Sequence, residues 1–322
     1  MSRILVTGGA GFIGSHLCEN LLSNGHTVVC YDSFDEFYPR KLKEQNISNC
    51  SLNPEFTLVE GDIRDRALLD EVFTHHGFDS VVHLAARAGV RPSLEQPELY
   101  AEVNVAATIG LFEICRRSNV KQIVFASSSS VYGDRDDGPF RESDNTDHPL
   151  SPYGSTKKAG EVIAHVYSHL YGISIACLRF FTVYGPRQRP DLAIRKFVKR
   201  ALSGEPIPVF GDGSSRRDYT HINDIIGGIS GALRWVASKE GRYGIFNLGS
   251  HAPVELRLLL QWIEEDTGKP LNIDRMPPQP GDVFQTFADT TQAEQELGFR
   301  HDVQFRDGIK DFIEWMRKYD LS

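Results

Sequence analysis

A glycine-rich stretch near the start of the chain, TGGAGFIG at residues 7–14, limits the possible folds more than any other feature. It directly follows an apolar run at 3–7 and opens a helical pattern near 12–24, which is the strand-to-helix setting that a phosphate-binding glycine loop requires. Gly8 permits the tight turn, Gly11 lets backbone N–H groups approach a pyrophosphate, and Gly14 lets helix and strand pack closely. The stretch therefore predicts a dinucleotide-binding βα unit.

An acidic residue follows at the spacing that such a unit needs. The second apolar run, TVVCYD, ends at Asp32, about 20 residues after the loop, where a carboxylate can accept both ribose hydroxyls of adenosine. A carboxylate there would repel a 2′-phosphate, so the sequence favours NAD over NADP. The alternative is a glycine-rich turn with an acid nearby by chance. Asp62 and Ile63 follow the third predicted strand, where the adenine edge is expected, and Leu84, Ala85 and Ala86 end the fourth strand under the expected pyrophosphate.

The first half of the chain alternates short β-branched runs with helical patterns. Strands are predicted at 3–7, 27–32, 56–60, 79–83, 121–127 and 173–180, and helices near 12–24, 64–76, 98–118 and 153–171. Strands that alternate with helices form βαβ units with right-handed crossovers. The predicted fold is therefore α/β, with a doubly wound parallel Rossmann sheet.

The pattern changes after residue 180, where Pro and Gly become dense and short helices dominate. We interpret this part as a smaller α/β substrate-binding lobe built outside the sheet. FNLG at 246–249 is apolar enough to return to the main sheet. The predicted domains are therefore an NAD-binding Rossmann domain at 1–178 plus about 220–248, and a nucleotide-sugar-binding lobe at 179–219 and 249–322.

Composition excludes several classes of function. The 322 residues carry a net charge of −8, which argues against nucleic acid or an anionic membrane as the main partner. Five separate cysteines without a Cys-x-x-Cys pair favour neither a disulfide scaffold nor a zinc site, and fit a reduced cytoplasm. No apolar run reaches about 18 residues, and glycines interrupt the start before a signal peptide can form. We expect no metal and a cytoplasmic location.

Tyr153 and Lys157 stand four residues apart at the start of a predicted helix, in SPYGSTKKAG. At that spacing they share one helix face. An ammonium beside the phenol, with an oxidised nicotinamide nearby, would lower the tyrosine pKa towards neutrality, where the phenolate can act as a general base. His83 is interpreted as a packed core histidine rather than as an acid or base.

These motifs occur in a recognisable order. TGGAGFIG, Asp32, HLAA, SSSSVYG, YGSTK and RDYTHINDI together resemble the extended short-chain dehydrogenase/reductase family, which includes nucleotide-sugar epimerases and dehydratases. The resemblance implies that Ser128 hydrogen-bonds the sugar 4-hydroxyl, that Tyr153 takes its proton and that NAD⁺ takes the C4 hydride. Lys157 would also hold the nicotinamide ribose, and Asn104 would neighbour the cofactor. The full set of expected cofactor residues is Gly8, Gly11, Phe12, Ile13, Gly14, Asp32, Asp62, Ile63, Leu84, Ala85, Ala86, Asn104, Tyr153 and Lys157.

The serine run at 127–130 narrows the expected reaction. Related dehydratases carry an Asp-Glu pair beside the catalytic hydroxyl, and related decarboxylases carry a Glu just before Val-Tyr-Gly. This chain has Ser129 and Ser130 at those places. Without an acid to protonate C5 or a leaving hydroxyl, a 4-keto intermediate has one easy exit, which is to take its hydride back. This predicts epimerisation at C4.

Arginines dominate the stretch LRFFTVYGPRQRPDLAIRKF at 178–197, which contains Arg187, Arg189 and Arg195. A solvated basic loop is the plain interpretation, and an anion-binding cluster is the functional one. By the family resemblance Arg217 contacts the diphosphate and Phe210 packs against the uracil. Asp282 could bind the nucleotide ribose, while Gln279 replaces an arginine found in many relatives. The expected substrate residues are Arg87, Arg91, Ser128, Ser129, Thr182, Arg189, Phe210, Arg217, Gln279 and Asp282.

Position 182 separates branches of the family. Most relatives have Asn there, whereas this chain has Thr182, and FFTVYGPRQRPDLA with AGVRPSLE resembles the UDP-glucuronate 4-epimerase branch. Arg189 with Ser129 and Thr182 would form a pocket for the C6 carboxylate, which Arg can bind bidentately. The expected reaction converts UDP-glucuronate to UDP-galacturonate with tightly bound, recycled NAD.

Other functions stay open at this point. A UDP-glucose or UDP-N-acetylglucosamine 4-epimerase would need no carboxylate pocket. A UDP-glucuronate decarboxylase and a non-catalytic NAD-dependent regulator are further alternatives. By family analogy, the helices at 98–118 and 153–171 would pair with a second copy as a homodimer.

Overall fold

A parallel sheet runs through the larger lobe. The computed structural model describes residues 1–135, 137–277 and 283–319, and in them seven strands form this sheet in the order β10–β6–β5–β4–β1–β2–β3. The strands are β1 (Arg3–Thr7), β2 (Thr27–Asp32), β3 (Phe56–Glu60), β4 (Ser80–His83), β5 (Gln122–Ser128), β6 (Ser174–Phe180) and β10 (Tyr243–Leu248). The strand order reverses between β1 and β4, where doubly wound sheets bind their ligands.

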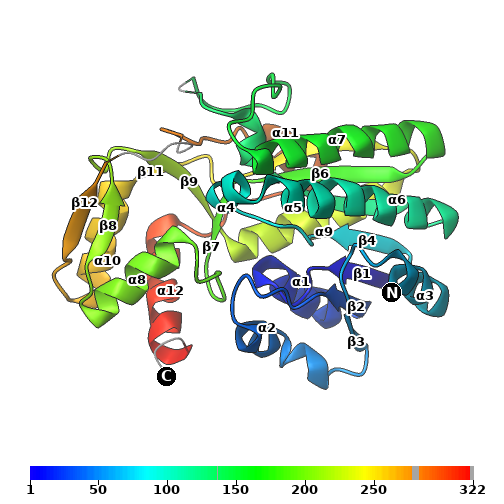
Figure 1. Ribbon diagram of the computed structural model, residues 1–322, viewed down its shortest axis with the longest axis horizontal. Coiled ribbons are helices and arrows are strands. Elements are labelled where there is room, and N and C mark those ends of the chain that lie inside the picture. The colour runs from blue at the N-terminus through cyan, green and yellow to red at the C-terminus, as the bar shows by residue number, and fades with distance from the viewer. Residues whose placement is uncertain (136, 278–282, 320–322) are drawn as a thin grey trace.

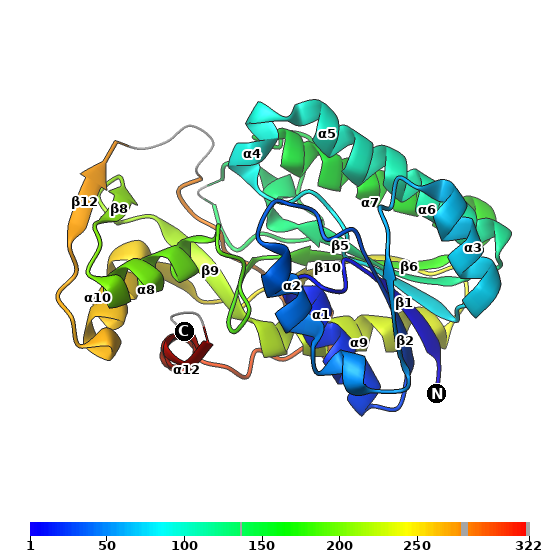
Figure 2. The same cartoon turned by 60° about the horizontal axis from the view of Figure 1, so that its bottom comes forward.

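Helices cover both faces of this sheet (Figures 1 and 2). One face carries α1 (Phe12–Ser23), α2 (Arg40–Ile47), α9 (Ile222–Ser238) and α11 (Thr291–Leu297). The other carries α3 (Arg66–His76), α6 (Ala107–Arg117) and α7 (Pro152–Tyr171), with α4 (Val90–Glu95) and α5 (Pro97–Ala101) above its edge. Alternate residues of each strand feed the two cores, as Ile4 and Leu5 do in β1. Burial on both faces explains why these strands are continuous apolar runs.

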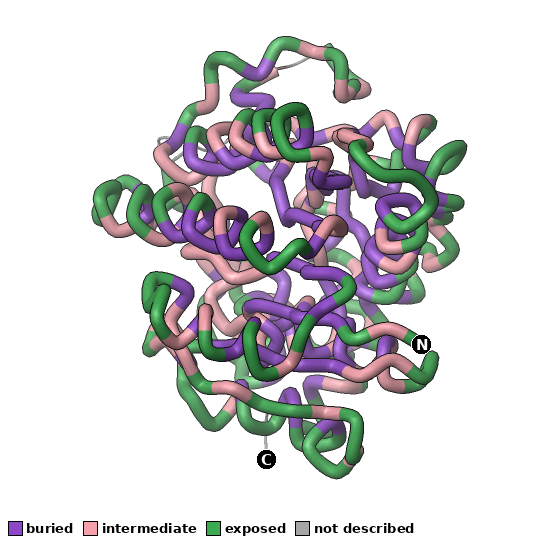
Figure 3. Tube along the Cα trace, turned by 90° about the vertical axis from the view of Figure 1, so that its right-hand side faces the viewer, coloured by how far each residue is buried: buried purple, intermediate pink, exposed green. Residues whose placement is uncertain are grey.

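Among the described residues, the smaller lobe is built from short strands and three helices. Its sheets contain β7 (Thr182–Tyr184), β9 (Arg216–His221) and β11 (Pro253–Glu255), and separately β8 (Ile207–Phe210) and β12 (Ile273–Met276). The helices α8 (Ala193–Ser203), α10 (Leu256–Thr267) and α12 (Phe305–Tyr319) enclose a separate core that includes Val198, Ile263 and Phe312. Figure 3 shows that buried residues follow the inner trace of the molecule and exposed residues the outer turns.

The α/β fold and the seven predicted strand positions are confirmed, including the return of 246–249 to the sheet as β10, which pairs in parallel with β6. Two details differ from expectation. The helix predicted at 98–118 is divided by a π-helical segment at Glu102–Ala106. The predicted boundary assigned 249–322 to the smaller lobe, but Ala293, Leu297 and Phe299 belong to the sheet core beside α9.

Candidate active site

The carboxyl ends of the parallel strands place the predicted site residues along one edge of the sheet. Thr7 at the end of β1 pairs with His83 at the end of β4, and His83 pairs with Phe125 in β5. Ser128, the last residue of β5, stands opposite Phe180, two residues before Thr182. The glycine loop, the segment after β4, the serine run and Thr182 therefore share one edge.

The glycine loop is shaped for a close approach of backbone to backbone. Gly8 has φ +71°, and a Cβ there would lie 2.8 Å from the Ala85 backbone nitrogen. A Cβ on Gly14 would lie 2.2 Å from the Gly8 carbonyl oxygen, so this glycine allows the helix to pack on the turn. Gly11 caps α1, and no side chain hydrogen-bonds the first helical N–H groups. A helix N-terminus without a side-chain cap, beside a turn in which Gly8 and Gly14 leave no room for a Cβ, fits a pyrophosphate.

Asp32 is buried and held at the end of β2. Its Oδ2 accepts a hydrogen bond from the Ala10 backbone N–H at 3.1 Å, and its Oδ1 accepts one from Phe34 N–H at 2.9 Å. Lys43 Nζ, from α2, lies 3.2 Å from Oδ1. The carboxylate therefore stands beside the glycine loop as predicted, whereas the lysine that neutralises it was not predicted. Asp62 pairs with Arg64 at 2.8 Å, and Ile63 is buried in the core.

Asn104 fastens the segment after β4 to the first turn of α7. Its Oδ1 accepts from Arg87 N–H at 2.8 Å, while its Nδ2 donates to Arg87 O at 2.9 Å and to Thr156 Oγ1 at 3.0 Å. Thr156 in turn donates to the carbonyl of Tyr153 at 2.9 Å. The asparagine thus fixes Leu84–Arg87 relative to the helix that carries Tyr153. Its expected place beside the cofactor stays a prediction.

Tyr153 and Lys157 lie one turn apart at the start of α7. Ser151 begins this helix by accepting from Gly154 N–H at 3.1 Å, and Pro152 occupies its first position. Lys157 is buried, donates to Ala126 O at 2.7 Å and lies 6.0 Å from the centre of the Tyr153 ring. Ser128 Oγ donates to Ser130 Oγ at 3.2 Å, at the end of the strand beside which Lys157 is anchored.

Burial dominates the titration of both groups. It lowers the pKa of Lys157 to about 8, against the attraction of the Glu161 carboxylate. It raises the pKa of Tyr153, while a hydrogen bond with Ser128 and the charge of Arg189 act in the opposite direction. The protein groups alone therefore keep Tyr153 protonated at neutral pH, and a further positive charge beside the phenol is needed for the phenolate.

Ser127, the first residue of the serine run, does not face the site. Its hydroxyl donates to Glu161 Oε1 at 2.6 Å, and Arg179 holds both oxygens of the same carboxylate at 2.8 and 2.9 Å. Arg179 also donates to Tyr132 Oη at 2.8 Å, and Tyr132 donates to Asn247 Oδ1 at 2.7 Å. This buried network joins β5, β6, α7 and β10 behind the candidate catalytic residues Tyr153 and Lys157. Sequence reasoning missed Glu161, although its position one turn after Lys157 was a usable signal.

Arg189 lies in the loop between β7 and α8 and is paired within the chain. Its Nε and Nη2 donate to the two oxygens of Asp191 at 2.9 and 2.6 Å. The guanidinium also lies over the Phe37 ring, 5.2 Å from its centre. Its charge acts against the rise that burial causes in the pKa of Tyr153. Thr182 and Ser129 are partly exposed.

The other arginines of this stretch have structural contacts. Arg187 has φ +63° and its Nη2 donates to Glu19 Oε1 at 2.7 Å, so it links the loop to α1. Arg195 is buried beneath the Trp315 ring, 5.5 Å from its centre. The two arginines thus join elements of the fold, and of the three arginines Arg189 alone remains a candidate site residue.

The predicted nucleotide residues lie on several segments. Arg91 lies over the Phe210 ring at 5.0 Å, which brings α4 against β8. Arg217 donates to the carbonyls of Arg216 and Phe284 at 2.9 and 3.1 Å. Arg87 pairs with Asp35 and lies 5.5 Å from the centre of Phe37. Gln279 and Asp282 lie outside the described residues.

A family model decides the class of the protein. The model of the NAD dependent epimerase/dehydratase family matches residues 4–249, which span the glycine loop, Ser128, Tyr153 and Lys157. The chain belongs to this family. Its fold and site place it among the NAD-dependent nucleotide-sugar epimerases, the class that the motif order predicts.

Relatives and solved structures of the family are similar along nearly the whole chain. UDP-glucuronate 4-epimerase 1 of Arabidopsis thaliana is 42% identical, over 98% of this chain and 77% of the plant protein. A crystal structure of UDP-glucuronic acid 4-epimerase from Bacillus cereus, in complex with UDP-glucuronic acid and NAD, is 37% identical, with a TM-score of 0.92 and coverage of 98% and 99% of the two chains. The NAD-bound UDP-glucose 4-epimerase of Thermus thermophilus is 33% identical, with a TM-score of 0.89 and coverage of 98% and 99%.

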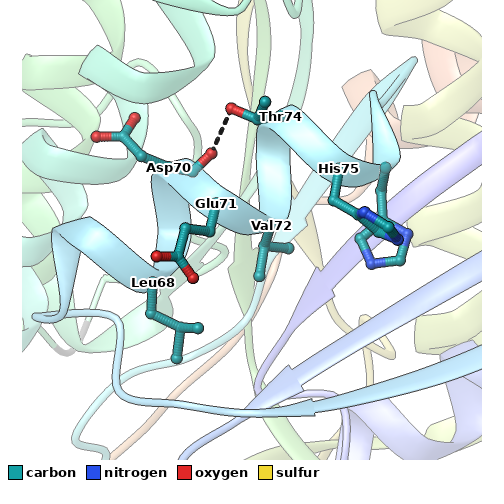
Figure 4. A pocket seen from close by; sticks show the side chains of 7 residues that line it. Leu68, Asp70, Glu71, Val72, Thr74 and His75 are labelled. Carbon is teal, nitrogen blue, oxygen red and sulfur yellow. Dashed lines mark hydrogen bonds between the residues drawn. The ribbon is translucent and has the colours of Figure 1, made fainter.

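His83 and a hollow along α3 do not belong to the candidate active site. His83 is buried between Thr7 Oγ1 at 2.7 Å and Thr108 Oγ1 at 3.0 Å, and burial lowers its pKa to about 3, so it is a neutral core residue as predicted. A hollow along α3 contains none of the predicted site residues (Figure 4). It is lined by Leu68, Asp70, Glu71, Val72, Thr74, His75 and His76. Within the described residues, each helix is too short or too polar to cross a membrane.

Proposed function

We propose that the protein interconverts UDP-glucuronate and UDP-galacturonate by inversion at C4 of the sugar. The observation that carries this proposal is that hydroxyls and no acid occupy positions 129 and 130, directly after Ser128, while the loop after Thr182 presents Arg189, whose Nε and Nη2 are held by Asp191. The relatives named as UDP-glucuronate 4-epimerases support it across almost the full chain.

The cofactor residues fit NAD. The bare N-terminus of α1 would hold the pyrophosphate, Asp32 the adenosine ribose and Lys157 the nicotinamide ribose. Bound NAD⁺ supplies a hydride acceptor and a positive charge. Burial raises the pKa of Tyr153 and so keeps the phenol protonated. The positive charge of the cofactor would lower this pKa and favour the phenolate. We propose that the cofactor stays bound and is reused in each turnover.

The protein residues move one proton and orient the sugar. Ser128 donates or accepts a hydrogen bond at the 4-hydroxyl, and the Tyr153 phenolate takes the hydroxyl proton as the C4 hydride leaves. Lys157, held at Ala126 O, stabilises the phenolate. After the 4-keto ring turns over, the hydride returns to the opposite face and Tyr153 gives the proton back to the oxygen. No further acid is required, which agrees with Ser129 and Ser130.

A pocket for the C6 carboxylate would distinguish this function from that of a UDP-glucose or UDP-N-acetylglucosamine 4-epimerase. Arg189, Thr182 and Ser129 would hold the C6 carboxylate and so orient the C5–C6 bond of the keto intermediate. The 4-keto form of a uronate is a β-keto acid, which loses CO₂ when that bond aligns with the carbonyl π-system. The same contacts would therefore provide specificity and protect the intermediate.

The test is to incubate the protein with UDP-glucuronate, UDP-glucose and UDP-N-acetylglucosamine in turn, and to follow the anomeric and H4 signals by NMR. Conversion of UDP-glucuronate to UDP-galacturonate, with little turnover of the neutral sugars, is expected. Preference for UDP-glucose would overturn the uronate assignment in favour of the neutral-sugar epimerase. A UDP-pentose as main product would indicate a decarboxylase, and no turnover of any sugar nucleotide would indicate a regulator.

We further propose a homodimer formed through α6 and α7. Ile109 on α6 and Val162, Val166 and Leu170 on α7 are apolar and exposed. Paired with a second copy, the two helices would bury this stripe in a four-helix interface. Light scattering after gel filtration should give twice the chain mass, and Val166→Arg should give the single mass. A wild-type monomer would exclude the interface.

The five buried free cysteines support a reducing compartment, for which we propose the cytoplasm.

A further inference from the structure

The guanidinium of Arg189 is held along one edge only. Asp191, two residues later in the same loop, accepts one hydrogen bond from Nε and one from Nη2 in a bidentate contact. A guanidinium carries five N–H donors in a rigid planar fork. The contact leaves both hydrogens of Nη1 and one of Nη2, which form the end of the fork. In the described part of the chain, no residue accepts a hydrogen bond from that end.

A second contact limits the movement of the guanidinium. Arg189 lies over the Phe37 ring, and its side chain is 18% exposed while that of Asp191 is 30% exposed. The Phe37 backbone is fixed in turn because its N–H donates to Asp35 Oδ1 at 2.9 Å. The aromatic ring thus packs against the guanidinium, and Asp191 engages its Nε–Nη2 edge. Together these two contacts restrict the orientation of the unpaired end.

We propose that Asp191 is a positioning residue that holds Arg189 with the Nη1–Nη2 end directed at the C6 carboxylate of the substrate. This inference rests on the proposed function, because a neutral sugar has no group for that end to bind. Asp191 does not touch the reacting atoms and acts through Arg189 alone. Its loss frees the arginine side chain, and the carboxylate is then held at a variable angle.

A loosely held carboxylate changes the product as well as the affinity. When the C5–C6 bond of the 4-keto intermediate aligns with the C4 carbonyl, that bond breaks and CO₂ leaves. Its electron pair moves into the enolate over C5, C4 and O4, and C5 then takes a proton from water. The product is a UDP-4-keto-pentose, and the hydride remains on the reduced cofactor. The share of pentose in the product therefore reports the orientation of the carboxylate.

The experiment compares Asp191→Asn, Asp191→Ala, Arg189→Ala and the double variant R189A/D191A in the holoprotein. Each is assayed with UDP-glucuronate and UDP-glucose, and the products are separated by mass spectrometry. The Asp191 variants should raise KM for UDP-glucuronate about 3- to 10-fold, as expected when one immobilised side chain is freed. They should also form detectable UDP-4-keto-pentose and leave the slow turnover of UDP-glucose unchanged.

The double variant tests whether Asp191 affects substrate binding only through Arg189. If Asp191 acts only through Arg189, R189A/D191A should behave as Arg189→Ala does, and the two losses should not add. Asp137→Asn is the matched control, because Arg135 donates to Asp137 through the same two nitrogens at 2.9 and 3.0 Å, also two residues apart. This control should leave KM and product ratio at wild-type values. Thermal melting identifies any variant that fails to fold, and Asp191→Asn keeps the shape of the side chain.

Three outcomes would overturn the inference. Additive losses in the double variant would show that Asp191 acts elsewhere. Tighter binding of UDP-glucuronate by Asp191→Asn would show that Asp191 competes with the substrate for Arg189. Equal losses on both sugars would show a general structural role. The wild-type assay separates these outcomes from failure of the proposed function, since that failure shows as preference for UDP-glucose before any variant is made.

Discussion

The hydroxyl of Ser127 donates a 2.6 Å hydrogen bond to the buried carboxylate of Glu161, one turn beyond Lys157 on α7. The next residue of the strand, Ser128, points to the site instead, because successive strand residues face opposite sides. The serine run therefore has two roles. Ser127 fastens β5 to the helix that carries Tyr153 and Lys157, and Ser128 to Ser130 are the residues that we propose to line the sugar site.

Breaking the ion pair behind the site should cost stability. Glu161 and Arg179 are each 1% exposed, and removing one partner leaves the other charge buried without compensation. Glu161→Gln should lower the free energy of unfolding by about 3–5 kcal/mol, measured by urea denaturation. The surface pair Glu113–Arg116 gives the control, since Glu113→Gln should cost under about 1 kcal/mol. Equal effects of the two changes would contradict this view of the network.

Removing the Tyr153 hydroxyl should stop catalysis and leave cofactor binding intact. Tyr153→Phe removes the proton acceptor, and general acid–base catalysis contributes roughly 10²–10⁴-fold, so kcat should fall at least that far. The content of bound NAD should not change. Tyr167→Phe is the control on the same helix, because Tyr167 hydrogen-bonds Glu113 away from the site. Turnover near the wild-type rate in Tyr153→Phe would place the base elsewhere.

Arg189→Ala should impair UDP-glucuronate much more than UDP-glucose. A charged hydrogen bond contributes on the order of 1.5–3 kcal/mol, so the loss should be about 10- to 100-fold in kcat/KM. Residual turnover should yield UDP-4-keto-pentose. Arg187→Ala serves as a neighbouring control, because Arg187 pairs with Glu19. The same loss on both sugars would remove Arg189 from the carboxylate pocket.

The buried Lys157 should make activity and stability respond to pH in opposite ways. Burial lowers its pKa from 10.5 to about 8, so between these values the unfolded chain binds more protons than the folded one. The contribution of this group to stability therefore rises as pH increases from 8 to 10.5. Activity should fall in the same window, because the neutral amine no longer stabilises a phenolate.

Lys157→Met isolates this response. It should remove the pH-dependent gain, which we expect to be on the order of 2 kcal/mol between about pH 7.5 and 9.5 in urea denaturation. Activity profiles of the wild type over the same range test the catalytic half of the prediction. If the unfolding curves of the wild type and the variant change in parallel with pH, Lys157 does not titrate in this window.

The nucleotide released on denaturation should be NAD⁺ or NADH. Asp32 is fixed by Ala10 N–H and Phe34 N–H, so its carboxylate cannot turn away from a 2′-phosphate. Enzymatic cycling assays specific for each nucleotide measure the ratio. A majority of NADP(H) would mean that Lys43, 3.2 Å from Asp32, selects the phosphate instead.

The sequence predicted the sheet well because its strands are buried on both faces and so consist of continuous apolar residues. The glycine loop, Asp32 and the Tyr153–Lys157 pair were also predictable, since each depends on residues close together in the chain. Contacts between residues that are distant in the sequence could not be predicted. Arg187 could not be assigned to Glu19, which stands 168 positions earlier, nor could Ser127 be assigned to Glu161.

Other differences have local causes that the residue pattern does not show. The π-helical segment at 102–106 keeps the apolar spacing of an ordinary helix, and its effect is to bring Asn104 to the segment after β4. Arg189 and Asp191 stand two apart in the sequence, but their order does not reveal which edge of the guanidinium is engaged. The residue pattern of α11 resembles that of the neighbouring helices in the smaller lobe. Only the packing of α11 against α9 assigns it to the core of the main sheet.

Strand β10 is synthesised long after its partner strand β6, and this order affects folding during synthesis. This strand pairs with β6, and Ile245 meets Cys177, 68 positions earlier. During synthesis β6 therefore emerges as the outer strand of an incomplete sheet, and its unpaired backbone groups can template aggregation. A chain truncated before residue 243 should accumulate in inclusion bodies. Trp235 packs 5.2 Å from Phe246, so its fluorescence reports the moment at which the last strand docks.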